Sequence, residues 1–339
     1  MNTSKKSGGE SCQSLKPSEQ KITYFSQAPK VSIGMPIYNG GESLLYALDS
    51  LRDQTFSDYE LIITDNVSTD NTPEICRHYA ASDPRITYIR NAVALHPMEN
   101  FNRSLHLARA QYFMWAAHDD VREPQFIATL VKALDENPSA VVAFCGFDNI
   151  NTEGRCVKRF NSNWGNVFSS SKFRQYIAMT LWDDIRTQKA NAPIYGLMRL
   201  PVLLACGGMK PVPDIVFCGE DILALLRLLS HGDFYYENEV LFHYRVRTHA
   251  TRASGESLLK YLGDRALRKT KHHRGSLLLF LSRNRAYHRE MRSIILRQAP
   301  LSALQKIILC ILLLVREFWI PIRTIPLTAL HELRPRMKK

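Results

Sequence analysis

The sequence predicts an α/β fold in which a mostly parallel sheet is covered by helices on both faces. Apolar runs typical of buried strands alternate with amphipathic helical patterns between residues 31 and 147. Apolar residues make up 45% of the 339-residue chain and charged residues 22%. That composition suits a large folded core and excludes a mainly disordered chain. Polar residues follow several strands at their carboxyl ends, where the ligands of such sheets bind.

The first half of the chain gives the regular alternation. An apolar run over 31–38 is closed by an Asn39-Gly40-Gly41 turn, and a second apolar run covers 59–65. Residues 68–71 offer N-caps for a helix through Tyr79. The remaining elements are predicted from the same patterns: helices over 42–54, 98–110 and 124–136, and strands over 85–91, 111–117 and 140–147.

The second half is less regular. Elements between residues 151 and 192 are not placed by periodicity. Gly219-Glu220-Asp221 opens a helix that runs through Ser230, after a Gly-rich turn at 206–209. The aromatic stretch 234–247 indicates either two short strands or one strand with a break. We therefore expect a domain over 30–250, with halves at 30–150 and 151–250, preceded by a flexible tail over 1–29.

The N-terminal segment and the cysteines indicate the cellular compartment of the protein. The polar N-terminal segment lacks the apolar core of a secretory signal, and the seven cysteines form no CxxC pair. Both features favour a reducing, cytoplasmic location. Of the net charge of +12, residues 264–339 hold 17 Lys/Arg and 4 Asp/Glu, or +13, which leaves −1 for the rest.

The region 251–339 is predicted to be a basic, apolar helical appendage. Its longest apolar run, 307–315, is too short for a spanning helix, which needs about 20 residues. Basic residues among aliphatic runs indicate a segment lying on an anionic membrane surface, here the inner face of the cell membrane. Packing of this appendage on the main domain or a partner is the alternative. No nucleic-acid motif is present, so we expect no nucleic-acid partner.

Adjacent carboxylates form the main candidate for chemistry. Asp119-Asp120 directly follows the apolar run 111–117, at a strand's carboxyl end. Two such carboxylates repel each other unless a cation lies beside them, and Mg²⁺ or Mn²⁺ with phosphate oxygens is the natural partner. A solvated pair that caps the next helix is the alternative. Neither GxxxxGK[ST] nor GxGxxG occurs in the chain, which disfavours phosphate binding by a Gly-rich loop.

Four motifs in order resemble family 2 glycosyltransferases with the GT-A fold, a Rossmann-like sheet. These are the segment 31–55, the segment 59–72 with Asp65, the run ending in His118-Asp119-Asp120, and a Gly207-Gly208-Met209 turn followed by Gly219-Glu220-Asp221. The resemblance covers about residues 31–247. It implies an inverting, metal-dependent transfer of a sugar from a nucleoside diphosphate sugar to a hydroxyl of a glycan or lipid-linked saccharide, as in the synthesis of cell-surface polysaccharides.

The resemblance also implies residue roles. Asp221 would be the general base, with Glu220 beside it in the acceptor site. Asp119 and Asp120 would bind Mg²⁺ or Mn²⁺, with His249 as a third ligand and His243 as a further candidate. The donor-binding residues it implies are Pro36, Tyr38, Asn39, Asp65, Asn102 and Asp119, with Asp65 accepting a hydrogen bond from the base.

Departures from the family pattern blur the subfamily assignment, and two other functions stay open. His118 stands where a longer acidic motif would have its first aspartate, and Val67 replaces a small residue. A nucleotidyltransferase is one alternative, although it would more often have a Gly-rich loop near the first strand. A non-catalytic protein of the same fold that tethers a partner at the membrane is the other.

Overall fold

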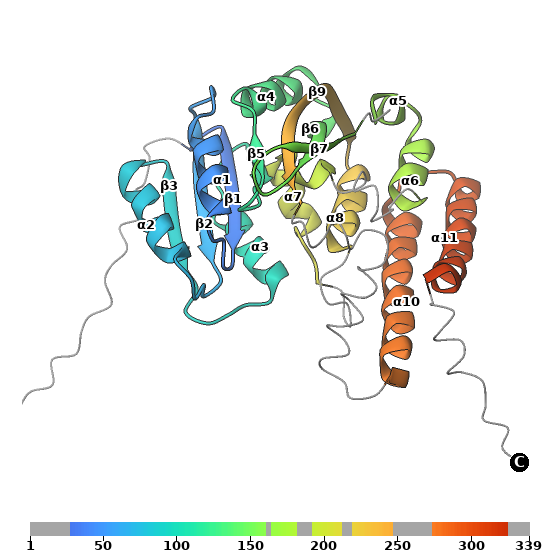
Figure 1. The fold of residues 1–339 in the computed structure, drawn as a ribbon. Helices are drawn as coiled ribbons and strands as arrows, with labels where there is room; N and C mark the ends of the chain where they lie inside the picture. The colour runs from blue at the N-terminus through green and yellow to red at the C-terminus, as the bar shows by residue number, and fades with distance from the viewer. Residues whose placement is uncertain (1–27, 161–163, 182–191, 212–218, 247–272, 325–339) are drawn as a thin grey trace, which may run out of the picture.

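The computed structural model describes residues 28–160, 164–181, 192–211, 219–246 and 273–324 (Figure 1). Their strands form one nine-stranded sheet in the order β3-β2-β1-β4-β8-β6-β9-β5, with β7 paired to β6. The strands are β1 (Val31–Ile37), β2 (Tyr59–Asp65), β3 (Ile86–Arg90), β4 (Tyr112–Trp115), β5 (Val121–Arg122), β6 (Ala140–Ile150), β7 (Cys156–Arg159), β8 (Leu197–Arg199) and β9 (Asp233–Arg245).

The sheet is mostly parallel, as the sequence predicts. Strands β3, β2, β1 and β4 are parallel neighbours, and β6 pairs in parallel with β9. The short strand β8 lies antiparallel between β4 and β6, so these two run in the same direction. The strand order reverses between β1 and β4, and the crevice beyond their carboxyl ends is where ligands of such sheets bind.

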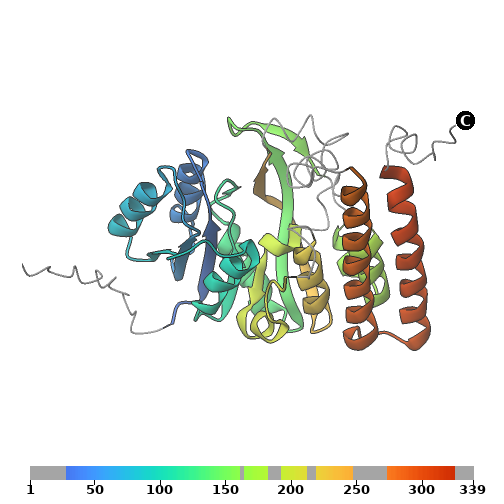
Figure 2. The ribbon, with the colours of Figure 1, turned by 90° about the horizontal axis from the view of Figure 1, so that it is seen from below.

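Helices cover both faces of the parallel part (Figures 1 and 2). Helices α1 (Ser43–Arg52) and α2 (Thr72–Ser82) pack together on one face, and α3 (Pro97–His106) packs on β1 and β2 from the other. Gly34 of β1 allows this close approach, because a Cβ there would lie 2.5 Å from Ser104 Oγ of α3. Both faces being covered, all seven residues of β1 are buried.

The second half completes the sheet and covers it. Helix α4 (Phe126–Glu136) packs on β6 and β9, and α8 (Glu220–Leu229) lies between the sheet and the C-terminal helices (Figure 2). The segment 151–192, which periodicity did not place, contains β7, α5 (Trp164–Phe168) and α6 (Lys172–Leu181). The 3₁₀ turn η1 (Ala192–Tyr195) begins at its end, and β8 and α7 (Leu200–Cys206) follow. Residues 234–247 were expected as one broken strand or two; within the described part they form one strand, β9, whose register with β6 shifts.

The C-terminal region forms a helical hairpin. Helix α10 (His273–Gln298) contacts α8, and α11 (Ala303–Thr324) contacts α6 and α10. Buried Met291, Ile294 and Leu309 join the core of the main domain. The expected helical appendage is therefore present, and its inner face packs on the domain. None of the helices in the described ranges combines the length and hydropathy needed to cross a bilayer.

Candidate active site

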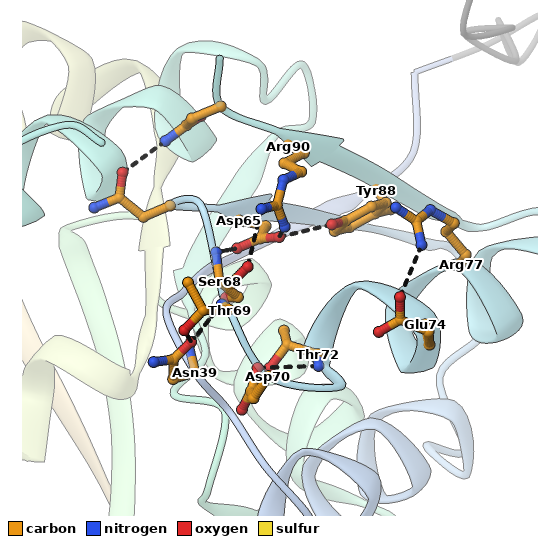
Figure 3. Close-up of polar contacts among 12 residues, drawn as sticks. Asn39, Asp65, Ser68, Thr69, Asp70, Thr72, Glu74, Arg77, Tyr88 and Arg90 are labelled. Atoms are coloured by element: carbon orange, nitrogen blue, oxygen red, sulfur yellow. Dashed lines mark hydrogen bonds and ion pairs between the residues drawn. The ribbon is translucent and has the colours of Figure 1, made fainter. Parts of the chain in front are cut away.

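The loop after β2 is held by Asp65, whose side chain is fully buried. Its Oδ1 accepts a hydrogen bond from the Ser68 backbone N–H at 2.8 Å. Its Oδ2 accepts from the Tyr88 hydroxyl at 2.7 Å and from Arg90 Nη1 at 2.9 Å (Figure 3). The carboxylate thus ties the loop to the end of β3. Because this carboxylate is fully buried, direct contact with a nucleotide base would require the surrounding loop to move.

The turn after β1 is joined to the same loop. Asn39 Oδ1 accepts from the Thr69 backbone N–H at 2.8 Å, and the Asn39 backbone N–H donates to Ser68 Oγ at 3.0 Å (Figure 3). Both loops hold a residue in the left-handed region, Asn39 at φ +51° and Val67 at φ +64°. Such a backbone is costly for a β-branched residue and marks a local conformation fixed by its surroundings. Tyr38 next to this turn is 56% exposed.

A buried arginine, Arg245, fixes the acidic pair. The Arg245 backbone N–H donates to Asp120 Oδ1 at 2.9 Å, and its Nε donates to the Asp119 carbonyl at 2.8 Å. Its Nη1 donates to the carbonyls of Asn151 and Thr152 at 2.8 and 2.9 Å. Arg245 at the end of β9 therefore holds the loop after β4 and the turn after β6 in one arrangement.

The two aspartates of the pair differ in environment. Asp119 is partly exposed, whereas Asp120 is fully buried. Among the described residues, Asp120 Oδ2 has no hydrogen-bond partner. Burial, with a smaller contribution from the charge of Asp119, raises the pKa of Asp120 to about 7, although Arg122 and Arg245 oppose this. A buried carboxylate oxygen without a partner is the type of group that a bound cation satisfies.

The Glu220-Asp221 pair begins α8. Gly219 precedes it at φ +95°, and a Cβ there would lie 2.5 Å from the ring of Tyr287 in α10. Only glycine therefore satisfies both the backbone and the packing at this position. Asp221 is partly exposed and accepts a hydrogen bond from the Ile222 backbone N–H, whereas Glu220 is buried. Asp221 is thus the member of the pair that an acceptor could reach.

The charges of three aspartates reach two partly buried tyrosines, Tyr195 and Tyr244. Burial raises the pKa of Tyr195 well above 10, and the charges of Asp120, Asp221 and Asp119 raise it further. The same three charges add to the effect of burial on the pKa of Tyr244. Asp221 at the start of α8 and the pair after β4 therefore act on the same two phenols, although they are about 100 residues apart in the sequence.

His243 forms a second acidic contact on β9. Its Nδ1 lies 2.6 Å from Asp148 Oδ1, and its Nε2 lies 2.9 Å from Glu123 Oε1. A histidine that bonds carboxylates through both nitrogens is protonated, because each nitrogen must donate. Burial would lower the pKa of His243, but the two carboxylates outweigh it and raise the pKa above 6.5. His243 of β9 is thus engaged with Asp148 of β6 and with Glu123, the residue after β5.

Three other expected site residues are Asn102, Pro36 and His249. Asn102 bonds the Met209 backbone through both groups of its amide, Nδ2 to the carbonyl at 2.7 Å and Oδ1 from the N–H at 2.9 Å. It therefore joins α3 to the Gly207-Gly208 turn. Pro36 is buried within β1. His249, expected as a metal ligand, lies outside the described residues. In the described ranges no group of three or more His, Cys, Asp or Glu residues could hold a metal ion alone.

Sequence reasoning missed several residues that organise this site. Tyr195 lies in a short 3₁₀ turn, and Arg122 in a two-residue strand, both too short for a periodic signal. The roles of Tyr88 and Arg90 depend on the parallel pairing of Asp65 with Arg90 across β2 and β3. Tyr244 and Arg245 lie in the aromatic stretch 234–247, but its pattern does not indicate which residues face the aspartates.

Comparison with known proteins agrees with this geometry. Residues 32–190 match the model of the family "Glycosyl transferase family 2". The glycosyltransferase GlyG of Streptococcus pneumoniae is 29% identical over 112 residues, which are 33% of this chain and 37% of GlyG. The uncharacterized glycosyltransferase YibD of Escherichia coli is 30% identical over 139 residues, 41% of this chain and 38% of YibD. The matched part spans less than half the length of each of these curated relatives.

Solved structures share the fold. The Staphylococcus aureus TarS 1–349 structure superposes with a TM-score of 0.58 at 16% identity, covering 91% of this chain and 76% of that one. TarS has also been solved with UDP-GlcNAc. The GT-A glycosyltransferase fold that the sequence predicts is confirmed by these neighbours. Residues 32–190, just under half of the chain, accordingly match glycosyl transferase family 2 in sequence, and the described residues have the fold of solved glycosyltransferases.

Proposed function

We propose that this protein transfers a sugar from a nucleoside diphosphate sugar to a hydroxyl group, with inversion at the anomeric carbon. The observation that supports this most is the convergence of Asp119, Asp120 and Asp221 on Tyr195 and Tyr244. This acidic cluster lies beyond the carboxyl end of β4, beside the point where the strand order reverses. In this cluster, Asp119 and Asp120 would lie on the side of the leaving diphosphate, and Asp221 would lie on the side of the acceptor hydroxyl.

Asp221 would act as the general base. The acceptor hydroxyl must lose its proton as its oxygen attacks the anomeric carbon, and a carboxylate within about 3 Å can take that proton. Asp221 suits this role because it is partly exposed at the first turn of α8, with buried Glu220 beside it. Attack from the face opposite the leaving diphosphate inverts the anomeric carbon, so no carboxylate nucleophile is needed.

Asp119 and Asp120 would hold a divalent cation, Mg²⁺ or Mn²⁺. The residues fit such an ion, because both are hard oxygen donors and Asp120 Oδ2 is buried without a partner among the described residues. Two carboxylates leave positions for diphosphate oxygens, and His249 could add a further ligand. When bound, the cation would neutralise negative charge on the leaving diphosphate. A structural neighbour, a mannosyltransferase from Pyrobaculum calidifontis, is described in complex with GDP-Man and Mn²⁺; it has a TM-score of 0.51, 17% identity, and coverage of 88% of this chain and 83% of its own.

The donor nucleotide would lie over the turns after β1 and β2. Exposed Tyr38 offers an aromatic face to a base, and Asn39 and Asp65 shape the pocket through the loop bonds described above. Pro36 and Asn102 would support this surface from β1 and α3. The glycan or lipid-linked saccharide acceptor, and a role in cell-surface polysaccharide synthesis at the cytoplasmic face of the membrane, belong to the same proposal.

The test is a screen of nucleotide sugars with and without Mn²⁺. The true donor should raise the melting temperature in a metal-dependent way and be slowly hydrolysed to the nucleoside diphosphate. Asp221→Asn should keep the thermal shift and lose turnover, while Asp53→Asn, at the exposed residue that follows α1, should change neither. Release of pyrophosphate from a nucleoside triphosphate would instead identify a nucleotidyltransferase. Donor binding without turnover by the wild type would favour a non-catalytic binding protein.

A further inference from the structure

The outer face of α11 is apolar along three turns. Six of its side chains, 38% to 67% exposed, follow one another at positions i, i+3, i+4, i+7, i+10 and i+11. We name this set the α11 stripe: Leu304, Ile307, Ile308, Ile311, Leu314 and Val315. A helix on the surface of a soluble domain normally turns polar residues outward. A contiguous aliphatic patch of this size marks an interaction surface.

The polar residues of α11 lie on its other faces. Glu317 is buried and pairs with Arg292 of α10 at 2.7 Å. Lys306 Nζ donates to the Leu296 carbonyl at 3.0 Å, and Arg316 donates to the Thr180 carbonyl of α6. Since the inner face of α11 already has its partners in α6 and α10, the exposed stripe is not needed to hold the hairpin together.

A row of arginines on α10 lies beside the stripe. Arg285, Arg289 and Arg292 follow helical spacing, and Arg285 and Arg289 are exposed. Arg285 and Arg292 both approach Glu317 of α11, and the charge of Arg292 acts on the thiol of Cys310. The arginine row therefore borders α11 on the side of Cys310. An apolar face edged by arginines is complementary to lipid bearing negative headgroups.

We propose that the α11 stripe and the arginine row form a docking surface for an anionic lipid bilayer, on which α11 lies in the plane of the membrane. A second copy of the chain fits less well, because an antiparallel face-to-face pair of α11 helices would bring the arginine rows of two copies together. The inference gives the membrane association in the proposed function a definite surface. It does not rest on the transfer chemistry.

Flotation of the full-length protein with vesicles tests this proposal. The wild type should float with phosphatidylcholine vesicles that contain phosphatidylglycerol, and much less with phosphatidylcholine alone. Ile307→Gln/Ile311→Gln keeps helix-forming residues on α11 and removes two aliphatic contacts, so the partition coefficient should fall by about tenfold or more. Val157→Gln/Leu204→Gln, at exposed apolar positions away from the stripe, should float like the wild type. Arg285→Gln/Arg289→Gln should weaken the preference for phosphatidylglycerol.

Three results would overturn the proposal. One is a wild type that stays in solution with both kinds of vesicle, and another is a stripe variant that floats as the wild type does. The third is a dimer, measured by light scattering, that the stripe variant dissociates while vesicles bind neither protein; a second copy would then cover the stripe. Hydrolysis of the nucleotide sugar without vesicles should be equal in all these variants, so failure of the transferase proposal would be seen separately.

Discussion

Replacing Asp120 by Asn should stabilise the metal-free protein above pH 7, although it removes an expected ligand from the active site. The Asp120 carboxyl is fully buried, and burial raises its pKa to about 7. The unfolded chain ionises this group near its ordinary value of 3.8. Ionising Asp120 therefore costs the folded state free energy that the unfolded state does not lose.

The size of the effect follows from the two pKa values. Moving a carboxyl pKa from 3.8 to about 7 corresponds to about 4 kcal/mol of unfolding free energy. The unfolded chain loses the Asp120 proton at a lower pH than the folded protein does. The free energy of unfolding of the wild type therefore falls as the pH rises from about 4 to 7 and is level above that, whereas the asparagine of the variant does not titrate. The attraction of Arg122 already lowers the pKa of Asp120, so it is included in this figure. Asn can still accept the Arg245 backbone N–H through its Oδ1.

Urea unfolding in EDTA at several values between pH 4 and pH 8 measures the difference. Asp120→Asn should match the wild type near pH 4 and exceed it by up to about 4 kcal/mol at pH 8. Asp53→Asn, at an exposed carboxyl, should show no comparable gain. A variant less stable than the wild type at pH 8 would refute the reasoning, because it would mean that the ionised carboxylate stabilises the fold by pairing with Arg122.

Three further substitutions test other parts of the site. Asp221→Asn should lower turnover by about 10²- to 10⁴-fold with donor affinity kept; full activity would exclude Asp221 as the base. His243→Gln should lower stability most at acid pH, because the raised pKa of His243 gives a contribution that is complete below pH 6.5 and is lost as pH rises through that pKa; a pH-independent loss in urea unfolding would contradict this. Arg245→Met should cost about 3 kcal/mol, since it removes three charge-assisted bonds to backbone carbonyls, and should weaken donor binding in calorimetry; an unchanged unfolding free energy would argue against the positioning role.

The parallel half of the sheet could be predicted because its strands are buried on both faces. Such strands appear in the sequence as continuous apolar runs. Strand β2 has the expected bounds, and β1 ends at Ile37, one residue before the expected end at Tyr38. The apolar run of β4 also marks where that strand ends. The acidic pair that follows it could therefore be proposed as a site, because the carboxyl ends of the strands in this fold face the ligand crevice.

The rest depended on contacts between distant segments. Strand β8 has three residues, and its pairing with β4 and β6 follows from tertiary packing instead of local periodicity. The sequence suggested Asp65 as a ligand of the base, but the register of β2 with β3 surrounds it with Tyr88 and Arg90. The sequence motif also could not predict that Asp120 is buried while Asp119 is partly exposed, because the side chains of neighbouring loop residues can point in opposite directions.

The contact of Tyr287 with Gly219 sets a limit on how this chain can be shortened. The ring stands against the backbone immediately before Glu220-Asp221, and Arg227 on the same helix pairs with Glu290 at 3.0 Å. Cutting the polypeptide near residue 250 would keep all the family motifs but remove α10, which packs on α8. It would expose one face of α8, a helix that is buried along nearly its whole length. A shortened chain that keeps the packing of α8 should therefore extend through α10, well past the point where the recognisable sequence motifs stop.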